Sequence, residues 1–136
     1  MKSLICTFLP IFLAVAAAPA QPRPPGKTGQ ARHKRIEYGT ASYYANKFQG
    51  RPTASGERYD KNKMTCAHNS LPMGTWIKVT NIKNKRSVIV RVTDRLHHSN
   101  KRLVDLSMIA AARLGYLRKG LTRVKVEVLA KKHPDN

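Results

Sequence analysis

Three side chains in this sequence could carry acid–base chemistry: Glu57, His68 and Asp94. Glu57 ends the turn-like run Thr-Ala-Ser-Gly-Glu, His68 follows it by eleven residues, and Asp94 lies a further 26 residues along the chain. A carboxyl or imidazole group held against a reacting bond can donate or accept a proton in the transition state. Asp94 ends a β-branched run, where a strand can present it to a cleft. Asp94 is therefore the first candidate for general acid–base catalysis.

Each of the three residues also has a structural interpretation. Asp94 can form a salt bridge with Arg91 or Arg95, which are close in sequence. Glu57 in a glycine-containing turn is more often a solvated residue than a catalyst. A single histidine such as His68 is more often a hydrogen-bonded structural residue, although its pKa range suits proton transfer. Considered singly, the residues favour Asp94 and leave the other two as structural.

The sequence has only seven acidic residues, so few other acids are available. Asp60 and Asp105 are the two that lie outside a predicted strand face and the chain ends. Asp105 comes just before a helix that is expected to begin after Ser107. Its carboxylate can cap backbone N–H groups there, or it can act as a reserve acid.

The adjacent pair His97 and His98 follows Asp94 closely. On an extended segment neighbouring side chains point to opposite sides, so the pair makes a weak metal site. The HExxH and CxxC spacings typical of zinc sites do not occur in the sequence. We expect no required metal and no cofactor.

Residues 36–129 are expected to form mainly β-structure with one short helix. β-branched residues concentrate in three runs: Trp76–Thr80, Ser87–Thr93 and Leu121–Leu129. The polar stretch between the first two runs predicts a hairpin. Ser107 is a natural N-cap, residues 108–114 favour a helix, and Gly115 is placed to end it. Many short strands with a single helix favour a small closed barrel, because closure removes exposed strand edges.

The two ends of the chain are expected to lie outside this domain. Residues 1–20 combine Lys2, an apolar run and an Ala-Pro-Ala site, which predicts a secretory signal peptide. That run is shorter than the roughly 20 apolar residues of a spanning helix. Residues 21–35 form a basic, proline-rich linker, and residues 130–136 form a flexible tail. We expect an exported, soluble, unlipidated monomer, periplasmic or secreted, with no transmembrane segment after cleavage and Cys66 as a buried thiol.

The charge of the chain points to an anionic partner. Its 26 lysine and arginine residues outnumber the acids to give a formal net charge of +19. Such a balance indicates binding to a polyanion and carries no information about the fold. Nucleic acid is one such class, but export favours envelope polymers such as wall glycans, teichoic acids or lipopolysaccharide. We expect no nucleic-acid partner.

Several stretches together carry a recognisable pattern, in order and at consistent spacing: Gly39–Tyr44, Phe48–Glu57, Thr65–Thr75, Val79–Asn81, Val90–Arg95 and Val104–Ala111. One stretch alone is weak, but all six resemble the RlpA (rare lipoprotein A) family. The resemblance covers Gly39 to about Val128. It implies an all-β fold, the six-stranded double-psi β-barrel.

The resemblance also implies an activity. Active members of the family are lytic transglycosylases, which cleave the β-1,4 bond between N-acetylmuramic acid and N-acetylglucosamine without water and leave a 1,6-anhydro end. They prefer glycan strands stripped of stem peptides, whose free lactyl carboxylates suit a basic protein. The family's functional residues fall on Glu57, His68 and Asp94. Asp94 is then the general acid–base, and the other two support it.

Further expectations concern substrate contacts. Tyr43 and Tyr44 can provide stacking surfaces for sugars, or serve the barrel core, and Arg95 is a further candidate contact. The family usually has Gly-Pro and an aromatic residue after the aspartate, where this sequence has Leu96-His97-His98. Two other functions stay open: a non-catalytic barrel that binds cell-wall polysaccharide, and an extracellular binder of polyanions or nucleic acid.

Overall fold

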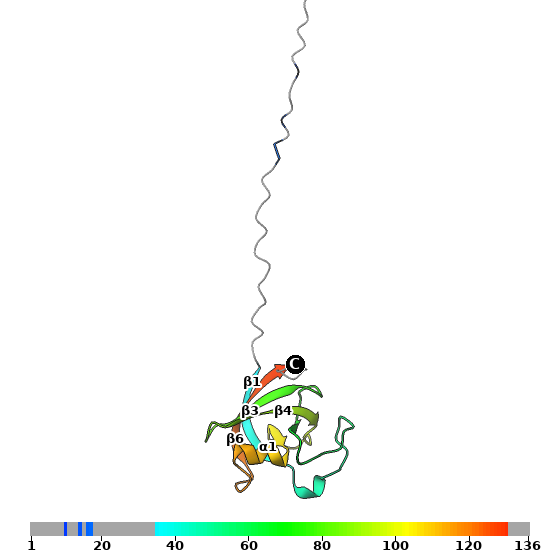
Figure 1. Ribbon diagram of the computed structural model, residues 1–136, viewed down its shortest axis with the longest axis vertical. Helices are drawn as coiled ribbons and strands as arrows, with labels where there is room; N and C mark the ends of the chain where they lie inside the picture. Colours follow the sequence, from blue (N-terminus) through cyan, green and yellow to red (C-terminus); the bar gives the residue numbers. More distant parts are fainter. Residues whose placement is uncertain (1–9, 11–13, 15, 18–34, 131–136) are drawn as a thin grey trace, which may run out of the picture. The chain divides into compact units, whose positions relative to one another are not determined.

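The computed structural model describes residues 35–130 and, outside any helix or strand, residues 10, 14, 16 and 17. The expected signal peptide and linker fall almost wholly outside the described residues, as does the tail beyond residue 130. Residues 35–130 form these elements, drawn in Figure 1: β1 (Ile36–Tyr43), the 3-10 helix η1 (Asn46–Phe48), β2 (Thr65–His68), β3 (Trp76–Asn81), β4 (Ser87–Asp94), β5 (Val104–Leu106), α1 (Met108–Leu114) and β6 (Thr122–Ala130). No helix among the described residues is long and apolar enough to cross a membrane.

The strands close into a barrel in the order β1-β5-β2-β4-β3-β6. β1 pairs with β5 and β2 pairs with β4 in parallel, and the other four pairings are antiparallel. Because parallel partners cannot be joined by a tight hairpin, the chain crosses the barrel between them. The closed six-stranded barrel with one α-helix confirms the predicted fold class and the β3–β4 hairpin.

The barrel interior is filled by β-branched side chains, because successive residues of a strand point inward and outward in turn. In β3, β4 and β6 the fully buried hydrophobic side chains are those of Ile77, Val79, Val90, Val92, Val124 and Val126. Burying one such side chain stabilises the fold by about 1.5–3 kcal/mol. The three β-branched runs of the sequence therefore form β3, β4 and β6, whose inward side chains make up much of the core.

The helix α1 has the predicted limits. Ser107 has the extended backbone of an N-cap, although its hydroxyl makes no capping hydrogen bond. Gly115 ends the helix in the left-handed conformation, with φ of 78°, and its N–H donates to the carbonyl of Ala111. Glycine suits this position because it has no Cβ to oppose a positive φ. Ala111 and Leu114 are fully buried against the barrel core.

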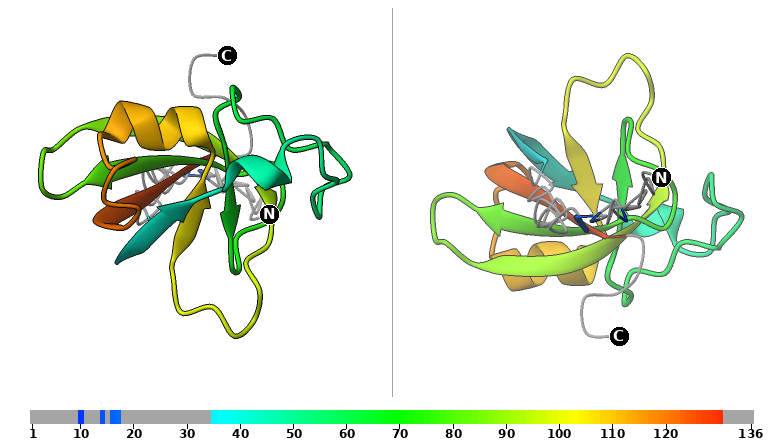
Figure 2. Two further views of the ribbon diagram at one scale, coloured as in Figure 1. Left: turned by 90° about the horizontal axis from the view of Figure 1, so that it is seen from below. Right: turned by 90° about the horizontal axis from the view of Figure 1, so that it is seen from above.

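The short strand β2 lies between β4 and β5, the strands that carry Asp94 and Asp105. Ala67 pairs with Asp94 of β4 on one side and with Asp105 of β5 on the other. A register shift between Cys66 and Ala67 adjusts the pairing to β4. The teal-to-green segment 45–64 and the yellow connection 95–103 flank this region in both views of Figure 2. Asp94 and Asp105 thus lie on the two strands that flank β2.

Gly39 permits the close approach of β1 to the residue that leads into β5. A Cβ built on Gly39 would lie 2.7 Å from Cβ of Leu103, and the N–H of Leu103 donates to the carbonyl of Thr40 at 2.9 Å. We expect Gly39→Ala to lower the free energy of unfolding by about 1–3 kcal/mol, because β5 must move to admit the methyl group. Urea denaturation of this variant and of Thr40→Ala, a control on the same strand, measures the effect. Equal stability of Gly39→Ala and the unchanged protein would contradict this role.

Candidate active site

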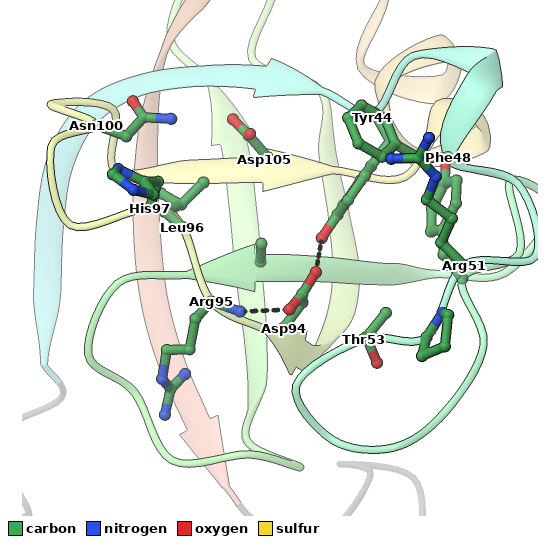
Figure 3. A pocket seen from close by; sticks show the side chains of 13 residues that line it. Tyr44, Phe48, Arg51, Thr53, Asp94, Arg95, Leu96, His97, Asn100 and Asp105 are labelled. Carbon is green, nitrogen blue, oxygen red and sulfur yellow. Dashed lines mark hydrogen bonds between the residues drawn. The ribbon is translucent and has the colours of Figure 1, made fainter.

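A cavity of about 420 Å³ opens between the 45–64 segment and the 95–103 connection (Figure 3). Ala67 of β2 contributes to its lining, and Asp94 and Asp105 enter it from the strands on either side. Neighbouring strands lie about 4.8 Å apart, so the backbones of the two acids are separated by about 10 Å. The cavity volume falls within the range of about 300–1,000 Å³ that is typical of small-ligand sites.

Asp94 is held by hydrogen-bond donors that carry no charge. Its Oδ2 accepts from the hydroxyl of Tyr44 at 2.7 Å, and its Oδ1 accepts from the backbone N–H of Arg95 at 2.8 Å (Figure 3). Oδ1 also accepts from the backbone N–H of Ala54 at 3.0 Å. Within residues 35–130, the ion pairs fall on other carboxylates. The interpretation that Asp94 pairs with Arg91 or Arg95 is therefore wrong, and in the described part of the chain no guanidinium pairs with its carboxylate, which faces the cavity.

Tyr44 belongs to an aromatic wall of the cavity. Its ring stacks on Tyr59 at a centroid distance of 4.3 Å and meets the edge of Phe48 at 5.8 Å. Burial, and then the hydrogen bond to Asp94, raise the pKa of the Tyr44 phenol far above its ordinary range. The phenol therefore stays neutral and can donate to a carboxylate or accept from a carboxylic acid.

The turn containing Glu57 supports Asp94 from outside the cavity. Both Glu57 oxygens accept hydrogen bonds from Arg91 of β4, at 2.9 and 2.7 Å, and this ion pair lowers the pKa of the Glu57 carboxyl. The N–H of Ser55 also donates to the carbonyl of Thr93 at 3.0 Å. These contacts hold the turn on β4, with the Ala54 amide directed at Asp94. Glu57 itself is not among the residues that line the cavity.

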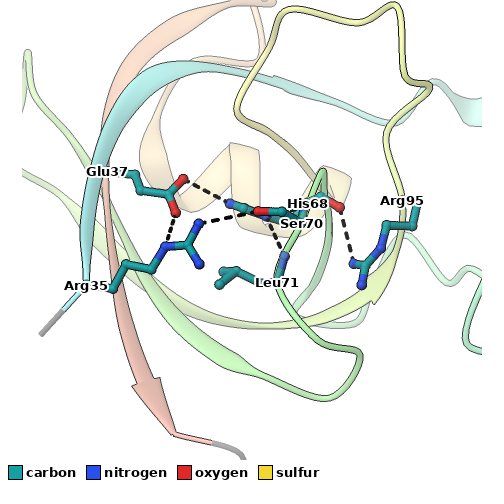
Figure 4. Close-up of polar contacts among 6 residues, drawn as sticks. All are labelled: Arg35, Glu37, His68, Ser70, Leu71 and Arg95. Atoms are coloured by element: carbon teal, nitrogen blue, oxygen red, sulfur yellow. Dashed lines mark hydrogen bonds and ion pairs between the residues drawn. The ribbon is translucent and has the colours of Figure 1, made fainter. Parts of the chain in front are cut away.

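His68 is fully buried, and it is not among the residues that line the cavity. Figure 4 shows its ring between Glu37 and the segment with Ser70 and Leu71. Its Nδ1 accepts from the backbone N–H groups of Ser70 and Leu71, both at 3.1 Å. Because a backbone N–H can only donate, the neutral ring carries its proton on Nε2. That atom lies 3.4 Å from Oε2 of Glu37, longer than an ordinary hydrogen bond. Burial lowers the pKa of His68, against the opposing effect of Glu37.

The backbone of His68 contacts a residue that lines the cavity. Its carbonyl accepts from Nη1 of Arg95 at 3.3 Å (Figure 4), and Arg95, a candidate substrate contact, is one of the lining residues. The structure thus brings only Asp94 of the three predicted residues into the cavity. Glu57 and His68 each contact an element that holds a cavity residue.

Asp105 enters the cavity lining but does not cap α1. Its two oxygens accept from Nε and Nη2 of Arg102, at 2.9 and 3.1 Å, and the N-cap position belongs to Ser107. The helix-cap prediction for Asp105 is therefore wrong, because β5 ends after it and its side chain turns toward the 95–103 connection. As a second carboxylate in the cavity, it keeps its place as the reserve acid.

Tyr43 points to the opposite side of β1 from Tyr44. Its hydroxyl donates to the carbonyl of Leu117 at 2.8 Å and its ring meets the edge of Tyr116. Tyr43 is absent from the cavity lining in the described structure, so it serves the core side of the barrel. The reason is strand alternation, which sends neighbouring side chains in opposite directions.

Arg51 and Asn100 are two of the cavity residues that were not predicted. Arg51 lines the cavity and places its guanidinium 5.1 Å from the Phe48 ring centroid. Asn100 lines it from the 95–103 connection. Arg51 lies inside the Phe48–Glu57 stretch that carried the family resemblance, which was the available signal. Asn100 lies in a loop that departs from the family pattern, so no sequence signal pointed to it.

The connection after Asp94 forms a turn rather than an extended segment. The N–H of Asn100 donates to the carbonyl of His97 at 2.8 Å, and Nδ1 of His97 lies 2.6 Å from Oγ of Ser99. The rings of His97 and His98 lie 4.1 Å apart, so the expectation that they point to opposite sides is wrong. Among the described residues, no three His, Cys, Asp or Glu side chains gather as a metal site.

Cys66 is a buried free thiol, as predicted, and burial raises its pKa well above the ordinary value. A protonated buried thiol is a poor nucleophile. It therefore belongs to the core and not to the site.

Residues 36–126 match the sequence family described as "Lytic transglycolase". The endolytic peptidoglycan transglycosylase RlpA of Pseudomonas aeruginosa is 53% identical over 89 residues, which cover 65% of this chain and 26% of that protein. The protein of the same name from Haemophilus influenzae is 46% identical over 103 residues, covering 76% of this chain and 36% of that protein. The chain thus spans roughly a quarter to a third of the length of these relatives.

Solved structures with this fold include the Streptomyces papain inhibitor, with a TM-score of 0.57 and 22% identity over 70% of this chain and 94% of the inhibitor. The Clavibacter michiganensis expansin gives a TM-score of 0.57 and 24% identity, covering 73% of this chain and 52% of the expansin. A variant of that expansin is in complex with cellohexaose. At these identities the likeness shows the fold, and it confirms the double-psi β-barrel.

The burial of His68 predicts a pH dependence of stability. The folded pKa lies below the ordinary value of 6.5, so the full contribution is present above 6.5 and is lost as the pH falls below it. Protonation of Nδ1 would also break its two hydrogen bonds from backbone N–H groups. We expect the unfolding free energy to fall between pH 7.5 and 5, and to fall less steeply in His68→Gln. Urea denaturation across this range, with exposed His97→Gln as the control, measures the difference; parallel pH profiles for all three proteins would contradict it.

Proposed function

Because the chain belongs to the RlpA-like double-psi β-barrel family of lytic transglycolases, we propose that it is an endolytic peptidoglycan lytic transglycosylase. It cleaves the β-1,4 bond between N-acetylmuramic acid and N-acetylglucosamine and leaves 1,6-anhydro ends. The observation that carries the proposal is Asp94, an acid in a cavity large enough for sugars and held by neutral donors. Residues 1–20 act as a signal peptide, residues 21–35 as a linker, and the exported domain works in the periplasm or outside the cell.

The chemical step needs one group that first donates and then accepts a proton. Asp94, as the carboxylic acid, protonates the glycosidic oxygen while the bond from that oxygen to C1 of the muramic acid breaks. The C6 hydroxyl of the same muramic acid then attacks C1, and its proton passes to the Asp94 carboxylate. One C–O bond breaks, another forms, and the net result is a proton moved from O6 to O4 without water.

Tyr44 supports both states of Asp94. Its neutral hydroxyl, 2.7 Å from Oδ2, can donate to the carboxylate or accept from the acid. The amide of Ala54 holds Oδ1 at 3.0 Å, which fixes the direction of Oδ2. These two hydrogen bonds keep the Asp94 carboxyl group in one orientation, directed into the cavity, during both proton transfers.

The remaining cavity surface supports binding of a peptide-stripped strand. Tyr44 and Phe48 present ring surfaces to sugars. Arg51 adds positive charge beside Phe48, and Arg95 adds it on the other side of Asp94 (Figure 3); a free lactyl carboxylate can bind to such a guanidinium. Arg95 is positioned by the backbone carbonyl of His68, and this is the support that His68 gives.

The first test is product analysis. Residues 21–136 are incubated with intact and peptide-stripped sacculi, and 1,6-anhydro products are sought by mass spectrometry. We expect Asp94→Asn to reduce the rate about 10²–10⁴-fold, because a general acid contributes about that much. Asp60→Asn, an acid outside the cavity lining, is the matched control.

The outcomes of this test distinguish a catalytic protein from one that only binds the cell wall. Anhydro product from Asp94→Asn at the unchanged rate would refute the assignment of Asp94. If neither substrate gives anhydro product but the protein still sediments with sacculi, the function is non-catalytic wall binding. Asp105→Asn in the same assay tests the reserve acid.

A second prediction separates a positioning role for Glu57 from a chemical one. The Glu57–Arg91 pair is partly exposed, with side-chain exposures of 48% and 30%, and such pairs contribute about 0–1 kcal/mol to stability. If Glu57 acts only by holding the 53–57 turn, Glu57→Gln and Arg91→Gln should slow product release by similar factors. The double variant should be no slower than either single one.

The measurement is a double-mutant cycle on initial rates of anhydro-product release. A far larger loss in Glu57→Gln than in Arg91→Gln would mean that Glu57 takes part in the chemistry. Melting temperatures of all variants serve as the control for folding.

A further inference from the structure

A basic, partly apolar surface lies at the end of the barrel where the β3–β4 hairpin meets the α1–β6 connection. We call it the hairpin pole and define it by these residues: Ile82, Lys83, Lys85, Lys119, Leu121 and Arg123. All six side chains are exposed. In both views of Figure 2 the hairpin lies on the opposite side of the barrel from the teal 45–64 segment that borders the cavity.

The hairpin pole carries two exposed aliphatic side chains, Ile82 and Leu121. Among the described residues, the large hydrophobic side chains most exposed to solvent are Ile36, Tyr38, Ile82 and Leu121. Tyr38 and Ile82 line one hollow of about 310 Å³ together with Lys85 and Lys125. Leu121 lines a neighbouring hollow of about 220 Å³. Three of the four exposed apolar side chains therefore border cationic hollows.

The pole carries little compensating negative charge. The sequence has no acid between Asp60 and Asp94 and none between Asp105 and Glu127. Glu127 is engaged by Lys125 at 3.2 Å. A side-chain hydrogen bond with Lys83, and then the charge of Lys83, lower the pKa of Lys119. A group of like charges favours a bound anion.

The two loops of the pole are held firmly against each other. The side-chain amides of Asn81 and Asn84 both donate to the carbonyl of Leu114 at the end of α1, at 3.0 and 2.8 Å. Thr122 donates through its hydroxyl to Oδ1 of Asn81 at 3.1 Å, and the N–H of Ile82 donates to the carbonyl of Arg123 at 3.1 Å. The backbone that carries the cations and the aliphatic side chains is thus held in place, which reduces the entropy lost on binding.

We propose that the hairpin pole docks onto the surface of an anionic phospholipid bilayer. Lysine and arginine side chains bind headgroup phosphates, and Ile82 and Leu121 enter the boundary between headgroups and acyl chains. The aliphatic side chains favour a bilayer over a dissolved polyanion, because a polymer of sugars or phosphates has no apolar phase to receive them. Docking through this pole leaves the cavity on the far side of the barrel, open to other molecules.

The test measures binding of residues 21–136, which contain the whole closed barrel and lack the apolar run near the N-terminus. Vesicles of phosphatidylcholine alone are compared with vesicles of equal parts phosphatidylcholine and phosphatidylglycerol, by co-sedimentation. The charge variant combines Lys83→Ser, Lys119→Ser and Arg123→Ser. The aliphatic variant combines Ile82→Ser and Leu121→Ser.

We expect binding to the phosphatidylglycerol vesicles only. The charge variant should bind about a hundredfold more weakly, because each cation near an anionic membrane contributes roughly fivefold. The aliphatic variant should bind about tenfold more weakly at unchanged net charge. A control with the same charge loss elsewhere combines Lys61→Ser, Lys63→Ser and Lys101→Ser, all exposed, and should lose much less.

Three outcomes would overturn the proposal. The first is absence of binding to the anionic vesicles. The second is equal loss in the charge variant and its control, which would mean that total charge alone is sensed. The third is unchanged binding by the aliphatic variant, which would point to a dissolved polyanion as the partner. Both pole variants should still release anhydro products from isolated glycan strands, so failure here and failure of the proposed activity are distinguishable.

Discussion

The barrel depends on the pairing of its short strand β2 with β4 on one side and β5 on the other. Ala67 is the shared partner of Asp94 and Asp105, and it is almost completely buried between them. A small residue at this position leaves room for a cavity above the strand. A bulkier side chain would fill the space that the two carboxylates face.

The distribution of charge gives the acids different roles. Glu57 and Asp105 are each held by an arginine, as is Glu37. Asp94 instead receives hydrogen bonds from a phenol and two backbone amides. Among the described residues Asp94 has no cationic partner, and the two arginines nearest to it in sequence are engaged elsewhere. Arg91 is engaged by Glu57, and Arg95 by the backbone carbonyl of His68.

Much of the architecture could be predicted because it rests on local patterns. The alternation of β-branched residues gave the strands β3, β4 and β6, and the Ser107 and Gly115 signals gave the limits of α1. The closed barrel followed from the number of short strands. The η1 turn and the direction of Tyr43 were not predicted, because the first has a weak local signal and the second depends on which face of β1 the core takes.

The sequence by itself determined the fold, the family stretches and the identity of Asp94 as the leading acid, since these depend on residue types and their spacing. Only the tertiary structure decided that Glu57 pairs with Arg91, that His68 is buried against Glu37, and that Asp105 binds an arginine instead of capping the helix. The physical reason is that ion pairs and burial depend on which strands become neighbours. In a barrel whose partners are distant in sequence, those neighbours are set by closure and not by local order.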